Sequence, residues 1–315
     1  MYTTLRKGAI NGLSTTWLLG KVIFPVTLIV TILSHTAVFD MLIHWISPVM
    51  SWLGLPGKAA VPLVLGNLLN LYAGIGAILS MDLTVKSVFI LAVMMSFSHS
   101  LLVECGVASR VGVKVWVMIV VRLGLAIVSA IVLGRFWQGG SSQAVYGFLQ
   151  SHATHPQTWI GIIEDGFEKA LFGIFQLAII VIPLLMIIQV LKDLRWIDVF
   201  AKWMIPAMRL LGVSSKSSTT LVSGLILGLT YGAGVMIQAV KADGLDRRSL
   251  YLSFIFLIGC HAIVEDTIIF APLGIALWPL VCLRLCVAIF ITWAVGMAWR
   301  IAERKTTEKR GSASL

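Results

Sequence analysis

The chain has 315 residues, of which 58% are hydrophobic and only 12% are charged, and its mean hydropathy is +0.96. A soluble domain carries about 25% charged residues, so the composition excludes an ordinary soluble protein and indicates a polytopic membrane protein in contact with the lipid bilayer. The formal net charge of +10 does not indicate a nucleic-acid partner, because the Lys and Arg residues lie mainly in loops and in the tail 300–310, where they determine topology.

In chain order, the first half predicts a membrane helix at 17–33, an amphipathic piece at 40–53 and a Gly-rich apolar segment at 59–79. Membrane helices follow at 88–105 and 115–136, since runs of about 20 apolar residues are long enough to span a bilayer. A polar linker at 138–157 contains a Gly-Gly-Ser-Ser stretch that predicts flexibility. The same order then returns at 171–190, 198–211, 217–240, 250–267 and 275–298.

The two halves are copies of each other, which a comparison of the chain with itself reveals. Matched residues, first copy before second, include Gly8 and Gly166, Pro25 and Pro183, Trp45 and Trp203, Gly74 and Gly232, His99 and His261, Glu104 and Asp266, Trp116 and Trp278, and Arg122 and Arg284. Matches at Trp and Pro, which are scarce here, are strong evidence for a duplication. We therefore predict repeat 1 at 1–137, the linker at 138–157, repeat 2 at 158–300 and a basic cytoplasmic tail at 301–315.

The basic loops predict that the copies are inverted. The loop 192–216 is rich in Lys and Arg, whereas its counterpart 35–58 has only Lys58; the loop 110–114 is basic, and its counterpart near 271–274 is not. Because basic loops favour the cytoplasm, equivalent loops lie on opposite sides. Every loop lies on the side that its charge predicts if each Gly-rich segment is re-entrant, entering and leaving the membrane on the same side. Both termini are then cytoplasmic, and we expect the protein in the plasma (cell inner) membrane. The alternative is an unbroken packing helix of the GxxxG type, which Gly224 and Gly228 satisfy.

The Gly-rich segments also carry a family resemblance. They read Leu-Gly-x5-Tyr-x-Gly-Ile-Gly over 65–76 and Gly-x3-Gly-x2-Tyr-Gly-x-Gly over 224–234. With the amphipathic piece before them and the polar-centred helix after them, they resemble the gate (nucleoside-recognition) domain. Concentrative nucleoside transporters, the membrane part of ferrous-iron permeases and spore-maturation membrane proteins share that domain. The resemblance implies a membrane gate or pore without naming a substrate, and the chain has no P-loop, so it is not a complete iron permease of that type.

Polar side chains within the apolar segments are the candidate site residues, because ionisable groups inside a span normally face a bundle interior or a water-filled cavity. For solute binding we predict Asn67, Asn70, Tyr72, Thr230, Tyr231 and Gln238, each of which could instead make a packing hydrogen bond. For coupling or ion binding we predict His99, Glu104, Cys260, His261, Glu265 and Asp266.

Three interpretations of the coupling residues stay open. One is a proton or ion relay, and another is ligation of a soft or borderline divalent metal. The third is a pair of structural ion pairs, Glu104 with Arg122 and Asp266 with Arg284, because a buried charge needs a partner.

The sequence therefore predicts an all-α polytopic membrane protein of two inverted repeats. Each has three transmembrane helices, an amphipathic helix and a Gly-rich re-entrant or broken segment. We expect a transporter or permease for a small polar solute or ion, nucleoside-like or a divalent cation, bound between the two Gly-rich hairpins. The alternative is a non-transporting membrane scaffold or assembly factor. No enzyme motif occurs, so neither an enzyme nor a cofactor is predicted, and the oligomeric state stays open, a homo-oligomer included.

Overall fold

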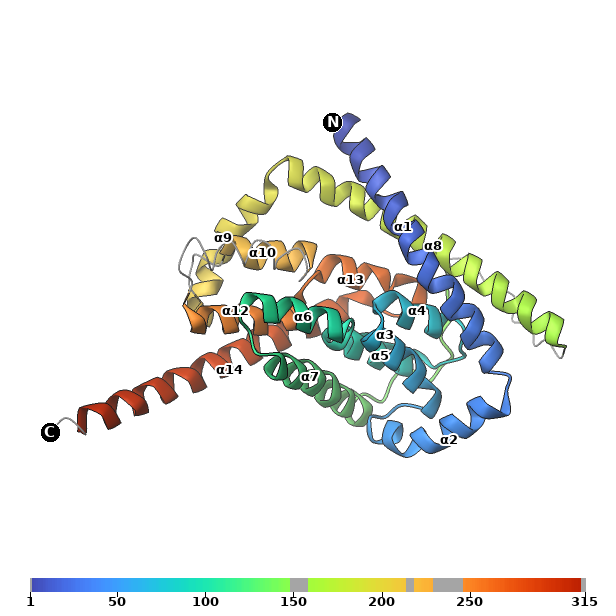
Figure 1. The fold of residues 1–315 in the computed structure, drawn as a ribbon, viewed down its shortest axis with the longest axis horizontal. Coiled ribbons are helices and arrows are strands. Elements are labelled where there is room, and N and C mark those ends of the chain that lie inside the picture. Colours follow the sequence, from blue (N-terminus) through green and yellow to red (C-terminus); the bar gives the residue numbers. More distant parts are fainter. Residues whose placement is uncertain (1, 148–157, 214–217, 229–245, 313–315) are drawn as a thin grey trace. The chain divides into compact units, whose positions relative to one another are not determined.

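The computed structural model describes residues 2–147, 158–213, 218–228 and 246–312, and its regular elements there are all helical (Figure 1). The first copy contains α1 (Tyr2–Leu33), α2 (Ala37–Trp52), η1 (Gly57–Ala59), α3 (Ala60–Leu68), α4 (Leu71–Leu79), α5 (Val85–Ser98), α6 (Leu101–Val111) and α7 (Val115–Phe136). The second contains α8 (Trp159–Asp193), α9 (Trp196–Leu211), α10 (Ser218–Leu227), α12 (Arg247–Cys260), α13 (Ile263–Ile269), η3 (Ala271–Leu273) and α14 (Leu277–Ser312).

Six helical segments among the described residues are long and apolar enough to cross a membrane: Tyr2–Leu33, Val85–Val111, Val115–Phe136, Trp159–Asp193, Arg247–Ile269 and Leu277–Lys305. There are seven if the pair α2 and η1–α3, bent by 89°, counts as one broken span. The predicted membrane class is confirmed. The second span of each copy is mostly buried, at 78% and 83%, whereas the other four are only 28–39% buried. These two central spans also contain the predicted coupling residues.

The Gly-rich segment of the first copy is interrupted, as predicted. It forms α3 and α4, nine residues each, and a helix of that length covers only about 14 Å of a hydrocarbon core about 30 Å thick. The two helices meet at the turn 69–70 and fold back on each other, so that a Cβ added at Gly74 would lie 3.2 Å from the Cα of Gly66. In the second copy α10 ends at Leu227 and Gly228 has a positive φ of 84°, so the helix ends at the positions equivalent to the turn 69–70. Residues 229–245 lie outside the described residues.

The first helices of the two copies, α1 and α8, pack along each other (Figure 1). Their contacts run in opposite directions along the two sequences, because Gly8 faces Met186, Gly12 faces Ile182, Gly20 faces Ile174 and Gly166 faces Leu28. The helices are therefore antiparallel. Glycine at the crossing permits close approach, since a Cβ at Gly12 would lie 2.8 Å from the Cα of Ile182.

The chain forms two compact units that do not coincide with the two copies. Unit 1 comprises Met1–Val103, Arg122–Arg195 and Val264–Val281, and unit 2 comprises Glu104–Val121, Trp196–Ile263 and Cys282–Leu315. Each unit thus contains the central histidine of one copy together with the segment that follows the central histidine of the other copy.

The first part of the predicted linker is an ordered segment in unit 1. The N–H groups of Val85 and Lys86 donate to the carbonyls of Ser142 and Gly140, at 2.9 and 2.8 Å. The N–H of Ala144 donates to Leu83 at 2.8 Å. Residues 138–147 therefore form hydrogen bonds with the start of α5, a contact that the composition of the linker did not indicate. Residues 148–157 lie outside the described residues.

Candidate functional site

Both central spans are broken at equivalent positions. His99 and Ser100 separate α5 from α6, and His261 and Ala262 separate α12 from α13. Ser100 and Ala262 have positive φ, 51° and 43°, which turns the chain sharply between the two half-helices. A break at membrane depth exposes main-chain N–H and C=O groups that need partners inside the protein or in a water-filled cavity.

The main-chain partners come from the Gly-rich segments. The N–H of Ser100 donates to the carbonyl of Gly66 at 2.9 Å, and that of Ala262 donates to the carbonyl of Gly224 at 3.0 Å. A larger residue at this position would require Met95 to move, because a Cβ at Gly66 would lie 2.7 Å from the sulfur of Met95. The glycines of the family-like motif therefore bring the Gly-rich helix against the break in the neighbouring span.

A buried arginine supplies the second main-chain contact in each unit. Arg122 on α7 donates to the carbonyl of His99, and Arg284 on α14 donates to the carbonyl of His261 at 2.6 Å. Both arginines are fully buried. A cation is favourable at a helix C-terminus, where carbonyls lack intrahelical partners. The predicted ion pairs Glu104–Arg122 and Asp266–Arg284 join residues of different units and stay predictions.

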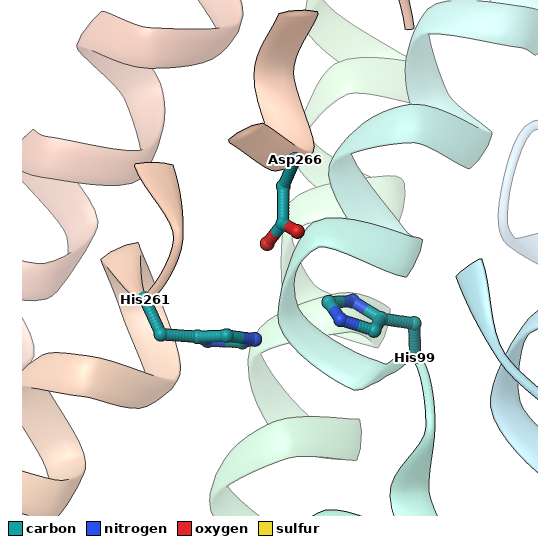
Figure 2. Close-up of side chains that lie close together, drawn as sticks. All are labelled: His99, His261 and Asp266. Carbon is teal, nitrogen blue, oxygen red and sulfur yellow. The ribbon is translucent and has the colours of Figure 1, made fainter. Parts of the chain in front are cut away.

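Each unit pairs a histidine of one copy with a carboxylate of the other. In unit 1 a ring nitrogen of His99 and a carboxylate oxygen of Asp266 lie within 4.8 Å of each other. The two side chains point toward one another (Figure 2). In unit 2 the Nε2 atom of His261 lies 3.2 Å from Oε1 of Glu104. All four side chains are buried. The His Nδ1 atoms face the carbonyls of Met95 at 2.6 Å and Leu257 at 2.9 Å, which fixes the rings.

A further contact between predicted site residues lies in unit 1. The hydroxyl of Tyr72, in the first turn of α4, donates to Oε1 of Glu265 at 3.3 Å. Glu265 lies in the first turn of α13, beside Asp266, where a helix N-terminus favours negative charge. The contact joins a predicted solute-binding residue to a predicted coupling residue, so the hairpin and the half-helix α13 are chemically connected.

Comparison with known proteins identifies the family. The model described as "Gate: Nucleoside recognition" matches residues 16–133 and 174–297, one segment in each copy. The chain belongs to the Gate family. It is also similar to the uncharacterized membrane protein YvoD of Bacillus subtilis (strain 168), with 53% identity over 293 residues, which covers 93% of this chain and 94% of that protein. No solved structure matches the chain.

Family membership confirms the predicted resemblance and the multi-pass membrane class, but it assigns no solute to this Gate protein. Three further predicted site residues make local bonds. Asn67 donates to the carbonyl of Leu63 at 2.8 Å, Asn70 caps α4 by accepting from the N–H of Ala73 at 2.9 Å, and Cys260 donates to Phe256 at 3.3 Å. The remaining predicted residues Thr230, Tyr231 and Gln238 lie outside the described residues.

Sequence reasoning missed two features of the site. It did not predict the left-handed residues Ser100 and Ala262, because neither Ser nor Ala is typical of positive φ. It also did not assign Arg122 and Arg284 to the histidine carbonyls. The available signal was a guanidinium inside an apolar span, which requires a partner of some kind but does not say which.

Proposed function

We propose that this Gate protein is a transporter or permease for a small polar solute or ion. The observation that carries the proposal is the matched interruption of both central spans, each with a histidine and a carboxylate at the break. Ionisable groups and broken helices are costly inside a membrane and occur where a pathway or binding site needs them. Broken segments in corresponding halves of a duplicated chain are typical of secondary transporters.

The antiparallel contact of α1 with α8 supports inverted copies. The two helices are equivalent in the duplication, and both are long enough to span the membrane. When two equivalent spanning helices pack in opposite directions, the copies enter the bilayer from opposite faces. Inversion agrees with the distribution of basic loops, which places both termini in the cytoplasm.

The solute site proposed here lies at the Gly-rich hairpins. In the first copy, Tyr72 is the polar side chain that connects the hairpin to Glu265. A solute that competes for the Tyr72 hydroxyl would change the environment of that carboxylate, which is how binding and coupling would communicate. Candidate solutes are nucleoside-like molecules and divalent cations.

Uptake into proteoliposomes tests the proposal, with a panel of nucleosides and divalent cations as substrates. Glu265→Gln is expected to abolish uptake while the protein still elutes as a single folded species. Glu168→Gln, an exposed carboxylate on α8, is the control and should transport normally. Wild-type uptake by the Glu265→Gln variant would refute the role of this site.

A non-transporting scaffold or assembly factor is the second candidate, and the local bonds of Asn67 and Asn70 favour it. These bonds show that two hairpin amides stabilise the hairpin itself. Cysteine scanning over 66–76 and 224–234 separates the candidates. A carrier should show positions that a water-soluble thiol reagent reaches, and a scaffold should show none.

A further inference from the structure

Two arginines of unit 2 lie against the same glycine. Gly212 follows the last residue of α9 and has a positive φ of 73°. A Cβ added there would lie 2.7 Å from Nη2 of Arg300 on α14 and 3.0 Å from Nη2 of Arg248 on α12. The rings of Tyr251 and Trp299, whose centroids are 5.8 Å apart, pack these two helices together beside the arginines. Because two guanidinium groups so close to one point repel each other, an anion bound between them would be stabilised.

Arg248 also has buried hydrogen-bond donors without acceptors. Its Nε and Nη2 atoms are buried, and neither has a hydrogen-bond partner among the residues that the structure describes. Asp246 interacts electrostatically with Arg248, but its carboxylate already caps α12 by accepting from the N–H of Ser249 at 3.0 Å. Buried donors of a charged group are costly to leave unpaired, so this part of unit 2 fits a ligand that supplies acceptor oxygens.

The first copy has a different arrangement at the equivalent positions. The duplication aligns Gly54 with Gly212, Lys86 with Arg248, and Gln138 with Arg300. In unit 1 a Cβ added at Gly54 would lie 2.7 Å from the Cα of Gly134, so a helix backbone takes the place of the two guanidinium groups. Lys86 donates to the carbonyl of Gly134 at 2.9 Å and so has an acceptor within the protein. The pair of converging arginines is therefore particular to the second copy and is not required by the fold.

The arginines also lie at the ends of two membrane spans. The candidate spans are Arg247–Ile269 and Leu277–Lys305, so Arg248 stands at the start of one and Arg300 near the end of the other. Trp203 on α9 is 74% exposed, and tryptophan is enriched at the boundary between membrane and water. This boundary is where the phosphate groups of lipids lie.

We infer that Arg248 and Arg300 bind the phosphate group of an anionic ligand, at a site distinct from the histidine centres. The planar fork of arginine matches the oxygens of a phosphate group with two parallel hydrogen bonds. The group can come from a lipid headgroup or from a soluble phosphate, and the position at the span ends favours a lipid. Its binding would connect the end of α9 to α12 and α14 and so stabilise unit 2.

Thermal unfolding of the purified full-length protein in detergent tests the site. The probes are phosphatidylglycerol and, for comparison, phosphatidylcholine, whose phosphate is neutralised by its own choline group. A ligand that binds only the folded protein raises the melting temperature by mass action, and we expect phosphatidylglycerol to raise it more.

Arginine variants show whether the shift depends on this site. In Arg248→Gln and in Arg300→Gln, the concentration of phosphatidylglycerol needed for a given shift should rise about tenfold, because charged hydrogen bonds to the phosphate are lost. Arg304→Gln removes an exposed arginine one turn further along α14 and is the control of equal charge. It should respond as the wild type does.

Inorganic phosphate, compared with chloride at equal ionic strength, identifies the source of the group. A shift with phosphatidylglycerol alone assigns the site to a lipid headgroup, whereas an arginine-dependent shift with inorganic phosphate assigns it to a soluble phosphate. Equal responses of Arg300→Gln and Arg304→Gln to both probes would overturn the inference, as would a wild-type protein that neither probe stabilises. Because Arg300 is exposed, its variant decides the matter even if Arg248→Gln does not fold.

Discussion

Ser100 and Ala262 occupy equivalent positions in the two copies, and both adopt left-handed backbone conformations, with φ of 51° and 43°. Each donates its N–H to a glycine of the Gly-rich segment, Gly66 or Gly224, at 2.9 or 3.0 Å. A residue with a Cβ adopts this conformation at a cost of about 1–3 kcal/mol. The occurrence of the same costly conformation in both copies indicates that the bond to the glycine carbonyl compensates for it.

Substitution of Ser100 by glycine should stabilise the protein by about 0.5–1 kcal/mol, because glycine adopts positive φ without steric cost. The measurement is thermal unfolding in detergent. Ser98→Gly is the matched control. Ser98 lies inside α5, where glycine costs about 1 kcal/mol. If both variants lose stability equally, the Ser100 conformation carries no strain.

Arg122→Gln should lower the free energy of unfolding by about 2–3 kcal/mol, because it removes a charged donor from the buried carbonyl of His99. Arg135→Gln, in the exposed last turn of the same helix, should change it by less than about 0.5 kcal/mol. Denaturant titration of both variants gives the comparison. Equal stability of the two would show that Arg122 does not hold the break.

Gly12→Ala should weaken the contact between α1 and α8, because the added Cβ would lie 2.8 Å from the backbone of Ile182. We expect a loss of about 1–3 kcal/mol, typical of overpacking. Gly20→Ala meets the Ile174 side chain at 3.5 Å, an ordinary van der Waals contact. The Gly20→Ala variant should be neutral or slightly stabilising in thermal unfolding in detergent. A greater loss of stability in Gly20→Ala than in Gly12→Ala would contradict the packing described for this helix pair.

Asp246 caps α12 by accepting a hydrogen bond from the N–H of Ser249 at 3.0 Å. Partial burial, the largest influence, would raise its pKa, but the hydrogen bonds from Ser249 together hold the pKa of Asp246 below its ordinary value. Asp246→Ala should therefore cost about 1 kcal/mol at neutral pH.

The pH dependence of the Asp246 cap follows from the lowered pKa. The charged cap contributes fully above the unfolded pKa of about 3.9, and its contribution is lost as the pH falls through the lower folded value. Asp246→Asn keeps a capping oxygen without the charge, so its stability relative to Asp246→Ala should not change over that acidic range. Stability curves of the three proteins at neutral and acidic pH provide the check.

The number of spans and the interrupted hairpin of the first copy could be predicted from the sequence. The length of an apolar run indicates whether a helix can span the membrane, and the spacing of the glycines indicates that the backbone can approach closely at Gly66 and Gly74. Scarce residues such as Trp and Pro made the duplication visible, and the family match falls on both copies.

The breaks in the central spans could not be predicted, because a few polar residues such as His99 and His261 inside an apolar span do not by themselves end a helix. Where a helix breaks within the membrane depends on contacts with residues distant in sequence. Here these contacts are a glycine carbonyl and an arginine on the following helix. The pairing of His99 with Asp266 and of His261 with Glu104 was hidden for the same reason. It depends on the exchange of segments between the copies, and composition does not record that exchange.

The crossing of α1 with α8 bears on the origin of the chain. Gly8 lies against Met186, and Gly166 lies against Leu28. Because Gly8 aligns with Gly166 and Leu28 with Met186, one contact is made twice about a two-fold axis, as in an isologous dimer of identical chains. A half-length chain with this helix would present a self-complementary surface to a second copy of itself, and a fusion of two such chains keeps that interface within one polypeptide.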